Sequence, residues 1–245
     1  MYFMAQKTQG LQITTILASQ SPARLETLRS AGIEPQVKVS EVDEDAVQAA
    51  HTGESYPGIV MALATAKAQE VYRELKLADS TSPTIVIGAD TMLEIEGELI
   101  GKPHRKEIAR QRWQAMRNSE GQLHTGHCVI FNPALLQQLN PADAPDDATV
   151  SPHYLRTVGT NFVSISATET TLVHFGNPTD ADLERYLNTP EPLHVAGSFT
   201  VDGLGGAFID RVEGDYHSVV GISLPLLRRI LNSEGANWTD LWTAN

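Results

Sequence analysis

An acid and a base stand at the two ends of one short predicted hairpin. The apolar run Ile85–Ala89 leads directly to Asp90 and Thr91, and Glu96-Gly97 supplies a turn before Lys102. Because the turn reverses the chain, Asp90 and Lys102 are expected to return to each other's neighbourhood. A carboxylate beside an ammonium suits chemistry on a phosphate.

A second group of polar residues lies where the first predicted strand passes into a helix. The run Ile13–Ala18 predicts a buried strand, Ser21 is a good N-cap, and Pro22 occupies the favoured first helical position. The free N–H groups and positive dipole end of a helix N-terminus suit phosphate. Capping accounts for Ser21 but not for Ser19, nor for Arg24 in a first turn where a cation opposes the dipole. We interpret Arg24 as facing an anion.

Two further charged features precede the hairpin. The acids Asp43–Asp45 follow a predicted strand that starts at Val37, and such a cluster is usually a solvated turn. It gains a role only if it faces another carboxylate and a metal. Lys67 lies within the apolar stripe of a helix predicted over Pro57–Leu77, where lysine is uncommon. The lysine either extends to the edge of the stripe or points into a cleft.

After the hairpin, hydrophobic periodicity predicts alternating helices and strands. The expected elements are a helix over His104–Asn118, a strand over His124–Phe131, a strand over Phe162–Phe175 that is either continuous or bulged at 168–170, a helix over Thr179–Asn188, a strand over Phe208–Val212, an extended segment over Tyr216–Ile222 and a helix over Leu224–Leu231.

Two segments break this alternation. Asn132–Asn161 holds four prolines and is predicted to be a surface insertion without a catalytic role. Glu191–Gly206 is irregular and contains five functional candidates, which are Glu191, His194, Ser198, Asp202 and a glycine cluster. The glycines lack the Lys-Ser/Thr of a Walker loop and are more typical of a tight turn.

The composition excludes several classes of protein. The 245 residues carry a formal net charge of −12, which argues against broad binding of nucleic acid or acidic membranes. No apolar run approaches the length of a membrane span, and residues 1–12 resemble a loose tail rather than a signal peptide. A single cysteine, Cys128, fits a reducing cytoplasm and is expected to be a buried strand residue. Six of the 18 Lys and Arg residues fall between Lys102 and Arg117, where most are expected on a solvated helix face.

Several short motifs occur together in a characteristic order. They are Ile16–Arg24, Val42–Glu44, Ala66–Ala68, Gly88–Thr91, Gly101–Pro103, Glu191–Leu193, Ala196–Ser198, Gly203–Gly206 and Val220–Pro225. Each motif is weak alone, but the ordered set resembles the Maf family of nucleoside triphosphate pyrophosphatases, and its details are most similar to the actinobacterial branch. The resemblance covers residues 13–231 apart from the insertion at 132–161.

The resemblance implies an α/β fold of the Maf/ITPase-like type: an elongated mixed sheet with flanking helices and two lobes around a cleft. It implies hydrolysis of a nucleoside triphosphate to a monophosphate and pyrophosphate with Mg²⁺ or Mn²⁺, and a homodimer. The expected organisation is a tail at 1–12, one catalytic unit over 13–232 and a C-terminal tail at 233–245. The apolar residues of that last tail would pack on the body or on a second copy.

Roles are carried over from the family position by position. Asp90 matches the acidic proton acceptor, Glu44 an acid near the metal, and Lys67 and Lys102 phosphate-facing lysines. Asp90 and Glu44 would hold the metal, because hard oxygen ligands favour Mg²⁺ or Mn²⁺ over zinc. The remaining matches are to the first phosphate loop, formed by Ser19, Ser21 and Arg24. Thr91 is not among these matches, but its place directly after Asp90 makes it a candidate to touch the base or sugar.

Two positions depart from the family branches that they resemble. Position 23 is Ala where the branch preferring thymine and uracil nucleotides has Arg. Position 202 is Asp where that branch has Gln and the branch associated with 7-methylguanosine nucleotides has Glu. A carboxylate can accept hydrogen bonds from guanine, so Ala23 and Asp202 suggest a purine or modified-guanine preference.

The family is also associated with septum formation, which leaves a second hypothesis. The chain would then be a non-catalytic, nucleotide-binding regulator of division. A nucleotidyltransferase is a third possibility and would require a second acceptor substrate. Carboxylates at both 44 and 90 beside three cations favour catalysis.

Overall fold

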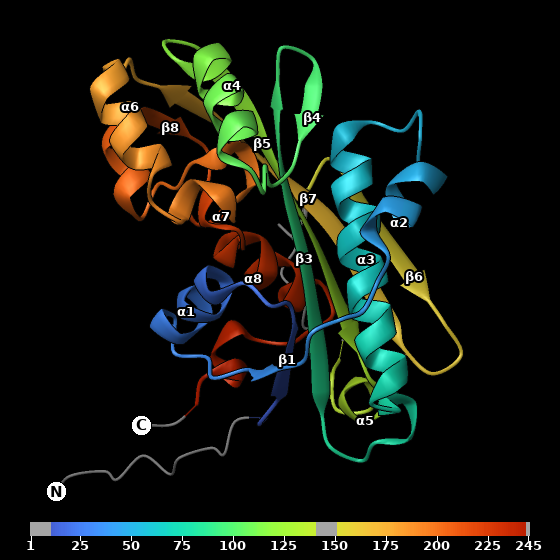
Figure 1. Ribbon diagram of the computed structural model, residues 1–245. Helices are drawn as coiled ribbons and strands as arrows, with labels where there is room; N and C mark the ends of the chain where they lie inside the picture. The colour runs from blue at the N-terminus through green and yellow to red at the C-terminus, as the bar shows by residue number, and fades with distance from the viewer. Residues whose placement is uncertain (1–10, 141–150, 244–245) are drawn as a thin grey trace, which may run out of the picture.

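The fold is built on one mixed, eight-stranded sheet with long central strands (Figure 1). The computed structural model describes residues 11–140 and 151–243, so most of the predicted tail at 1–12 lies outside the described residues. The strand order is β2-β1-β3-β5-β7-β6, with β4 on the end of β3 and β8 on the end of β7. The strands are β1 (Thr14–Ala18), β2 (Gln36–Val37), β3 (Thr84–Ile95), β4 (Glu98–Ile100), β5 (Glu120–Phe131), β6 (Tyr154–Val158), β7 (Val163–Phe175) and β8 (Ile209–Glu213).

Helices cover both sides of these strands. In Figure 1, α2 and α3 lie to the right of the strands, α1 and α8 to the lower left, and α4, α6 and α7 to the upper left. The helices are α1 (Pro22–Ser30), α2 (Glu44–Ala50), α3 (Tyr56–Glu74), α4 (Lys106–Met116), α5 (Pro133–Leu136), α6 (Asp180–Leu187), α7 (Tyr216–Val220) and α8 (Leu224–Ser233). Within residues 11–140 and 151–243, no helix combines the length and apolar content that crossing a bilayer requires.

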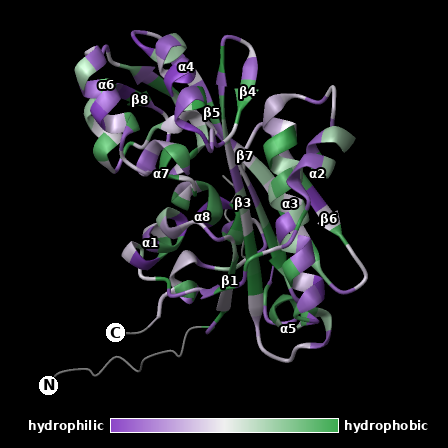
Figure 2. Ribbon diagram, in the orientation of Figure 1, coloured by the Kyte–Doolittle hydropathy of each residue, from purple (hydrophilic) through white to green (hydrophobic). Residues whose placement is uncertain are grey.

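The side of the sheet opposite α3 carries two separate hydrophobic cores. The lower core joins Leu17 and Ile87 to α8 and to Leu241, so the end of the chain packs on the body. The upper core surrounds Trp113 and Phe175. Hydrophobic residues are concentrated along β3, whereas hydrophilic residues predominate on the visible face of α4 (Figure 2). Two cores on one side of the sheet make two lobes, which confirms the predicted architecture.

The cleft lies where one edge of β3 has no neighbouring strand. Along this edge, β1 pairs in parallel as far as Gly88, and β4 begins to pair at Leu93. Asp90 and Thr91 fall in the gap, while the other edge of β3 stays paired with β5 throughout. Side chains alternate along a strand, so Asp90 points toward α3 and Thr91 toward the lobes. The open edge gives both of them access to the cleft.

Glycines in the central strands bring α3 close to the sheet. A Cβ at Gly88 would lie 2.2 Å from the Ala64 carbonyl oxygen, and one at Gly126, the register partner of Asp90, would lie 2.2 Å from the Val60 oxygen. These contacts involve backbone, which cannot move aside as a flexible side chain can. Glycine at both positions therefore allows Lys67 of α3 to approach Asp90.

We expect Gly126→Ala to destabilise the protein by about 1–3 kcal/mol, because the added methyl group overpacks the α3–sheet contact. Chemical denaturation measures the free energy of unfolding. Gly53→Asn is the control and should cost no more than about 1 kcal/mol of backbone strain at its positive φ, since no atom lies within 4 Å of a Cβ there and overpacking is absent. Equal effects of the two variants would contradict this packing argument.

Several local predictions were wrong. Tyr216–Ile222 is not extended, because Asp215 caps a short helix that ends at Gly221 (φ 127°). The acids after β2 are exposed as predicted, but they start a helix instead of forming a turn: Asp43 accepts from the Ala46 N–H and caps α2. The strand predicted to start at Val37 instead ends there, because β2 spans only Gln36–Val37.

The segment 132–161 holds regular structure of its own. It contains α5 and β6, and β6 pairs with β7. Residues 141–150 of it lie outside the described part of the chain. The strand that follows, β7, is continuous and keeps an unbroken register with β5 through 168–170. The predicted boundaries of the tails, the catalytic unit and the insertion stay predictions.

Candidate active site

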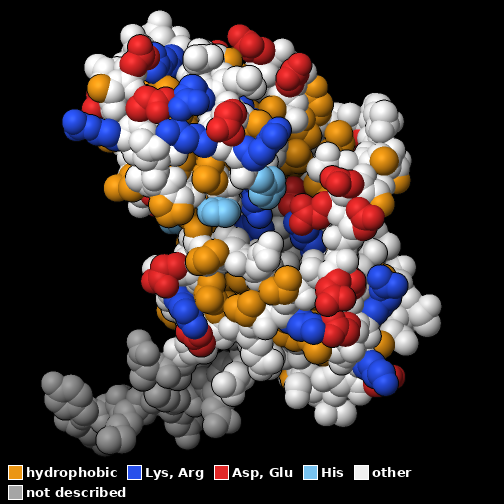
Figure 3. Space-filling model, viewed as in Figure 1, with side chains coloured by type: hydrophobic (Ala, Val, Ile, Leu, Met, Phe, Trp, Pro, Cys, Tyr) orange, Lys and Arg blue, Asp and Glu red, His pale blue; other side chains and the backbone are white. Residues whose placement is uncertain are grey.

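The ten residues that the sequence singles out all line one cavity of about 1260 Å³ between the lobes. Figure 3 shows this hollow, with basic, acidic and histidine side chains on its walls. They come from separate elements: the β1–α1 junction, α2, α3, β3, the β4–α4 loop and the segment before β8. The residues are Ser19, Ser21, Ala23, Arg24, Glu44, Lys67, Asp90, Thr91, Lys102 and Asp202.

Lys67 joins the two predicted catalytic carboxylates. Its ammonium lies 2.5 Å from Asp90 Oδ1 and 2.8 Å from Glu44 Oε1. Lys67 and Asp90 are 8% and 7% exposed, whereas half of the Glu44 side chain is exposed. The lysine therefore does not extend to the edge of the helix but points into the cleft. Within the described residues, the side chain of Asp90 makes no other hydrogen bond, so Oδ2 is available to a ligand.

Arg24 fastens the N-terminus of α1 to β3 and α7. Its guanidinium donates to Ser19 Oγ (3.1 Å), Thr91 Oγ1 (3.0 Å) and the Gly221 carbonyl oxygen (2.8 Å). Burial lowers the pKa of Arg24, and the nearby Asp90 and Glu44 carboxylates counter this only in part. The cation thus has hydroxyl and carbonyl partners, which leaves it able to attract an anion into the cleft.

A directed chain of hydroxyl groups continues from Arg24. Thr125 Oγ1 donates its one proton to the Ser218 carbonyl oxygen (2.9 Å), so it accepts from Thr91 Oγ1 at 3.1 Å. Thr91 then accepts from Arg24. The Thr91 hydroxyl therefore accepts one hydrogen bond from Arg24 and donates another to Thr125. That Thr91 touches the base or sugar stays a prediction.

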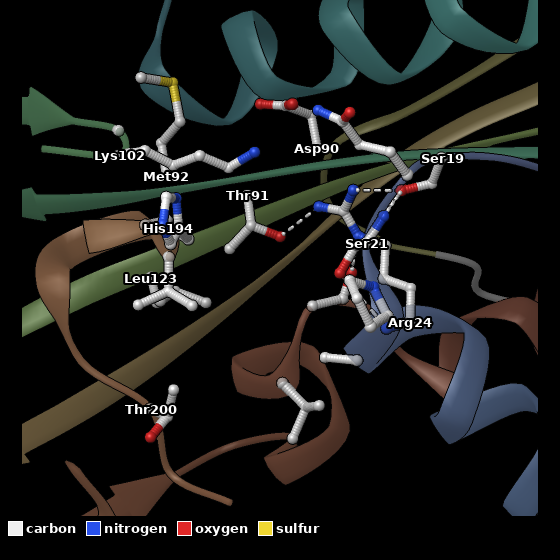
Figure 4. Close-up of a pocket in the computed structure, with 18 of the residues that line it drawn as sticks. Ser19, Ser21, Arg24, Asp90, Thr91, Met92, Lys102, Leu123, His194 and Thr200 are labelled. Atoms are coloured by element: carbon white, nitrogen blue, oxygen red, sulfur yellow. Dashed lines mark hydrogen bonds between the residues drawn. The ribbon is translucent and has the colours of Figure 1, made fainter. Parts of the chain in front are cut away.

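The other predicted residues differ in the hollows that they line. Lys102 is exposed, and its ammonium has no hydrogen bond or ion pair with any other residue in the described ranges. Figure 4 shows Lys102 beside His194, with Asp90 and Thr91 between this pair and Arg24. Ala23 and Asp202 also line a smaller adjoining hollow against α7. Lys102 does not line that hollow.

Sequence reasoning missed the role of one basic residue and left another unassigned. Arg112, placed on a solvated helix face by its charge pattern, lines the cleft. His194, a candidate of the irregular segment to which the sequence assigned no role, also lines it. His104, the first residue of the helix predicted over His104–Asn118, is exposed and lines the same cavity.

Glu191 organises the segment that carries Asp202. Its carboxylate accepts from Thr200 Oγ1 (2.6 Å), Tyr186 OH (3.1 Å) and the N–H groups of Leu204 (3.0 Å) and Gly205 (2.9 Å). Burial alone would raise the pKa of Glu191, but these hydrogen bonds outweigh it and lower the pKa.

A carboxyl group whose pKa is lowered on folding stabilises the protein above its unfolded pKa, about 4.3, and loses this effect as pH falls through the folded pKa. We therefore expect Glu191→Gln to destabilise by about 1–3 kcal/mol at pH 7, because an amide cannot accept all four bonds. The difference from the parent protein should shrink below about pH 4. Urea denaturation across pH measures it, with the exposed Glu107→Gln as control. A difference independent of pH would contradict the assignment.

The donor set at Asp90 fits a divalent ion that shares its ligands with substrate. Within residues 11–140 and 151–243, no group of three or more His, Cys, Asp or Glu residues forms a complete metal cage. Glu44 and Asp90 nevertheless converge on one cation, the Lys67 ammonium. One or two carboxylates completed by water and phosphate oxygens are typical of Mg²⁺ sites.

The fold and site define a class: a two-lobed α/β protein whose cleft sets a carboxylate pair among basic side chains. A family model described as Maf-like protein matches residues 14–234. A Rhodococcus jostii protein named nucleoside triphosphate pyrophosphatase is 46% identical over 231 residues, covering 94% of this chain and 96% of its own. A Streptomyces coelicolor protein of the same name is 43% identical over 227 residues, covering 93% of both chains. This chain belongs to the Maf family.

Proposed function

We propose that the protein hydrolyses nucleoside triphosphates to nucleoside monophosphates and pyrophosphate. The observation that carries the proposal is the contact of the buried Lys67 ammonium with Asp90 and Glu44 at the open edge of β3. The names of the relatives support the same activity. Because the substrate is highly charged, the cleft must supply cations as well as a proton acceptor.

Each side chain has a role in this reaction. A water oxygen attacks the α-phosphorus, the bond from that phosphorus to the bridging oxygen breaks, and pyrophosphate leaves. Asp90 accepts the water proton, and the Lys67 ammonium holds the carboxylate in place. Arg24 and Lys102 face the phosphates, while Ser19 and Ser21 at the N-terminus of α1 add neutral donors.

Glu44 and Asp90 would hold the divalent ion. A bound Mg²⁺ or Mn²⁺ would neutralise phosphate charge and draw the substrate toward Asp90. The two carboxylates come from different elements, α2 and β3, so metal and substrate together would fix α2 against the sheet.

The nucleobase lies at the end of the cleft marked by Ala23 and Asp202 in this proposal. Both residues line the adjoining hollow against α7. Asp202 is exposed and accepts hydrogen bonds only, which suits the N1–H and 2-amino groups of guanine. A purine or modified-guanine substrate is the one that this end of the cleft favours.

The proposal is tested by a panel of nucleoside triphosphates, including 7-methylguanosine triphosphate, with pyrophosphate release measured in Mg²⁺ and in Mn²⁺. We expect metal-dependent release of monophosphate and pyrophosphate in equal amounts, fastest with guanine nucleotides. A clear preference for dTTP or UTP would refute the assignment of Asp202, and orthophosphate as the product would refute the cleavage site.

A non-catalytic role as a regulator of septum formation is not favoured. Negative carboxylates facing a polyphosphate weaken simple binding, and they are useful where a metal and a proton acceptor are needed. We place the enzyme in the cytoplasm as a homodimer without nucleic-acid or membrane partners, as a house-cleaning activity on free nucleotides. Size-exclusion chromatography with light scattering tests the dimer.

A further inference from the structure

Helix α4 carries two arginines, Arg110 and Arg112, in opposite surroundings. Arg110 donates to both carboxylate oxygens of Glu184, at 2.6 and 2.9 Å, and is not part of the cleft wall. Arg112 lines the cleft, and its one hydrogen bond within the described residues is to the Gly101 carbonyl oxygen at 2.6 Å. No carboxylate of the described residues forms an ion pair with it.

This environment leaves the Arg112 cation without a counter-charge. Burial lowers the pKa of Arg112, and no neighbouring carboxylate opposes the effect. A guanidinium has five N–H donors, of which the Gly101 contact uses one. A partly buried cation with spare donors attracts an anion, and the planar fork of arginine matches two phosphate oxygens at once.

The position of Arg112 indicates which part of a ligand it meets. Gly101 directly precedes Lys102, and its carbonyl accepts from both Arg112 and the Gly197 N–H (3.3 Å). Arg112 and Lys102 therefore belong to the same wall of the cleft. Asp202 lines both the cleft and the adjoining hollow, whereas Arg112 and Lys102 line the cleft alone.

We propose that Arg112 is a further substrate-binding residue, which together with Lys102 contacts the β- and γ-phosphates of a nucleoside triphosphate. This inference rests on the proposed function for the nucleoside, but the subsite itself requires only a polyphosphate. A cation at the terminal phosphates favours triphosphates over diphosphates, because a diphosphate lacks the last of these groups. The arginine also holds the loop of Lys102 through Gly101.

The test measures binding of inorganic tripolyphosphate by isothermal titration calorimetry, in magnesium buffer and without turnover. Arg112→Met should lose about 10–100-fold in tripolyphosphate affinity, the worth of hydrogen bonds between charged groups. Its affinity for a nucleoside monophosphate should change by no more than about twofold. Arg112→Lys keeps the charge without the fork and should lose less. Arg110→Met, two residues away, is the matched control and should bind as the parent does.

A double-mutant cycle distinguishes direct contact of Arg112 with phosphate from an indirect effect in which Arg112 only positions Lys102. If Arg112 touches phosphate, Arg112→Met should weaken binding further in a Lys102→Met background. No further loss there would mean that Arg112 acts only by holding Lys102, and would overturn the proposal. Unchanged tripolyphosphate affinity in a folded Arg112→Met protein would overturn it as well, and so would a loss in Arg112→Lys as large as that in Arg112→Met.

The binding data test the phosphate subsite independently of the proposed enzyme activity. If the parent protein binds tripolyphosphate through Arg112 but releases no pyrophosphate, the phosphate subsite is supported and the proposed pyrophosphatase activity is refuted. In an active enzyme, Arg112→Met should lower the ratio of kcat/KM for triphosphate over diphosphate by about tenfold. An unchanged ratio would refute the subsite alone.

Discussion

Replacing Asp90 by asparagine should lower kcat for nucleoside triphosphate hydrolysis by about 10²–10⁴-fold while the protein stays folded. Asparagine has nearly the same shape but accepts no proton from water at neutral pH. The fold should survive because Lys67 retains Glu44 as a partner at 2.8 Å. Pyrophosphate release measures the rate, and circular dichroism during heating measures the folded state.

The control for this variant is Asp180→Asn. The Asp180 side chain is 91% exposed, pairs with Arg117 and lies outside the cleft wall, so its loss should leave the rate unchanged. A magnesium titration of Asp90→Asn distinguishes the two roles of the carboxylate. If excess metal restores the rate, Asp90 acts in metal binding, and if the rate stays low, Asp90 acts in proton transfer. Near-normal activity of Asp90→Asn at ordinary magnesium concentration would contradict both roles.

Replacing Lys67 by methionine should reduce both stability and kcat/KM. The ammonium is the only cation bonded to Asp90 within the described residues, and both side chains are about 90% buried. Removing one partner of a buried pair costs about 3–5 kcal/mol, and the lower end applies here because Asp90 borders an open cleft. We expect kcat/KM to fall by about 100-fold, since the carboxylate loses its support and the phosphates lose a cation.

Two comparisons identify the cause of that loss. Lys67→Met with Asp90→Asn should recover part of the stability, because the uncompensated carboxylate is gone. Mg²⁺ should stabilise Lys67→Met more than the parent protein, since the ammonium no longer competes for Glu44 and Asp90.

The control is Lys38→Met, which removes an exposed pair with Glu74 and should cost less than about 1 kcal/mol. Urea denaturation with and without Mg²⁺ makes these measurements, and equal stability of Lys67→Met and parent would contradict the assignment.

Local chemistry made much of the fold predictable. The Ser21-Pro22 start of α1 and the Glu96-Gly97 turn depend on side-chain caps and on backbone conformations that neighbouring residues dictate. Local signals failed where tertiary packing opposed them. Val219 and Val220 favour a strand, but the Asp215 cap and the contacts of α7 with the sheet make that segment a helix.

The candidate site was predictable as a set of residues but not as a geometry. Ordered motifs named Asp90, Lys67 and Glu44, and the cavity contains all three. The open edge of β3, where β1 stops at Gly88 and β4 starts at Leu93, depends on pairing between distant segments. No local pattern encodes that gap.

The sequence by itself determined the family, the succession of strands and helices around Asp90, and the residue types available to a phosphate. Only the tertiary structure decided which charges face one another. Arg110 and Arg112 are alike in sequence, yet one meets Glu184 outside the cleft and the other enters it. Two residues on a helix point about 200° apart, and the packing of α4 on the upper core fixes which of them faces the cleft.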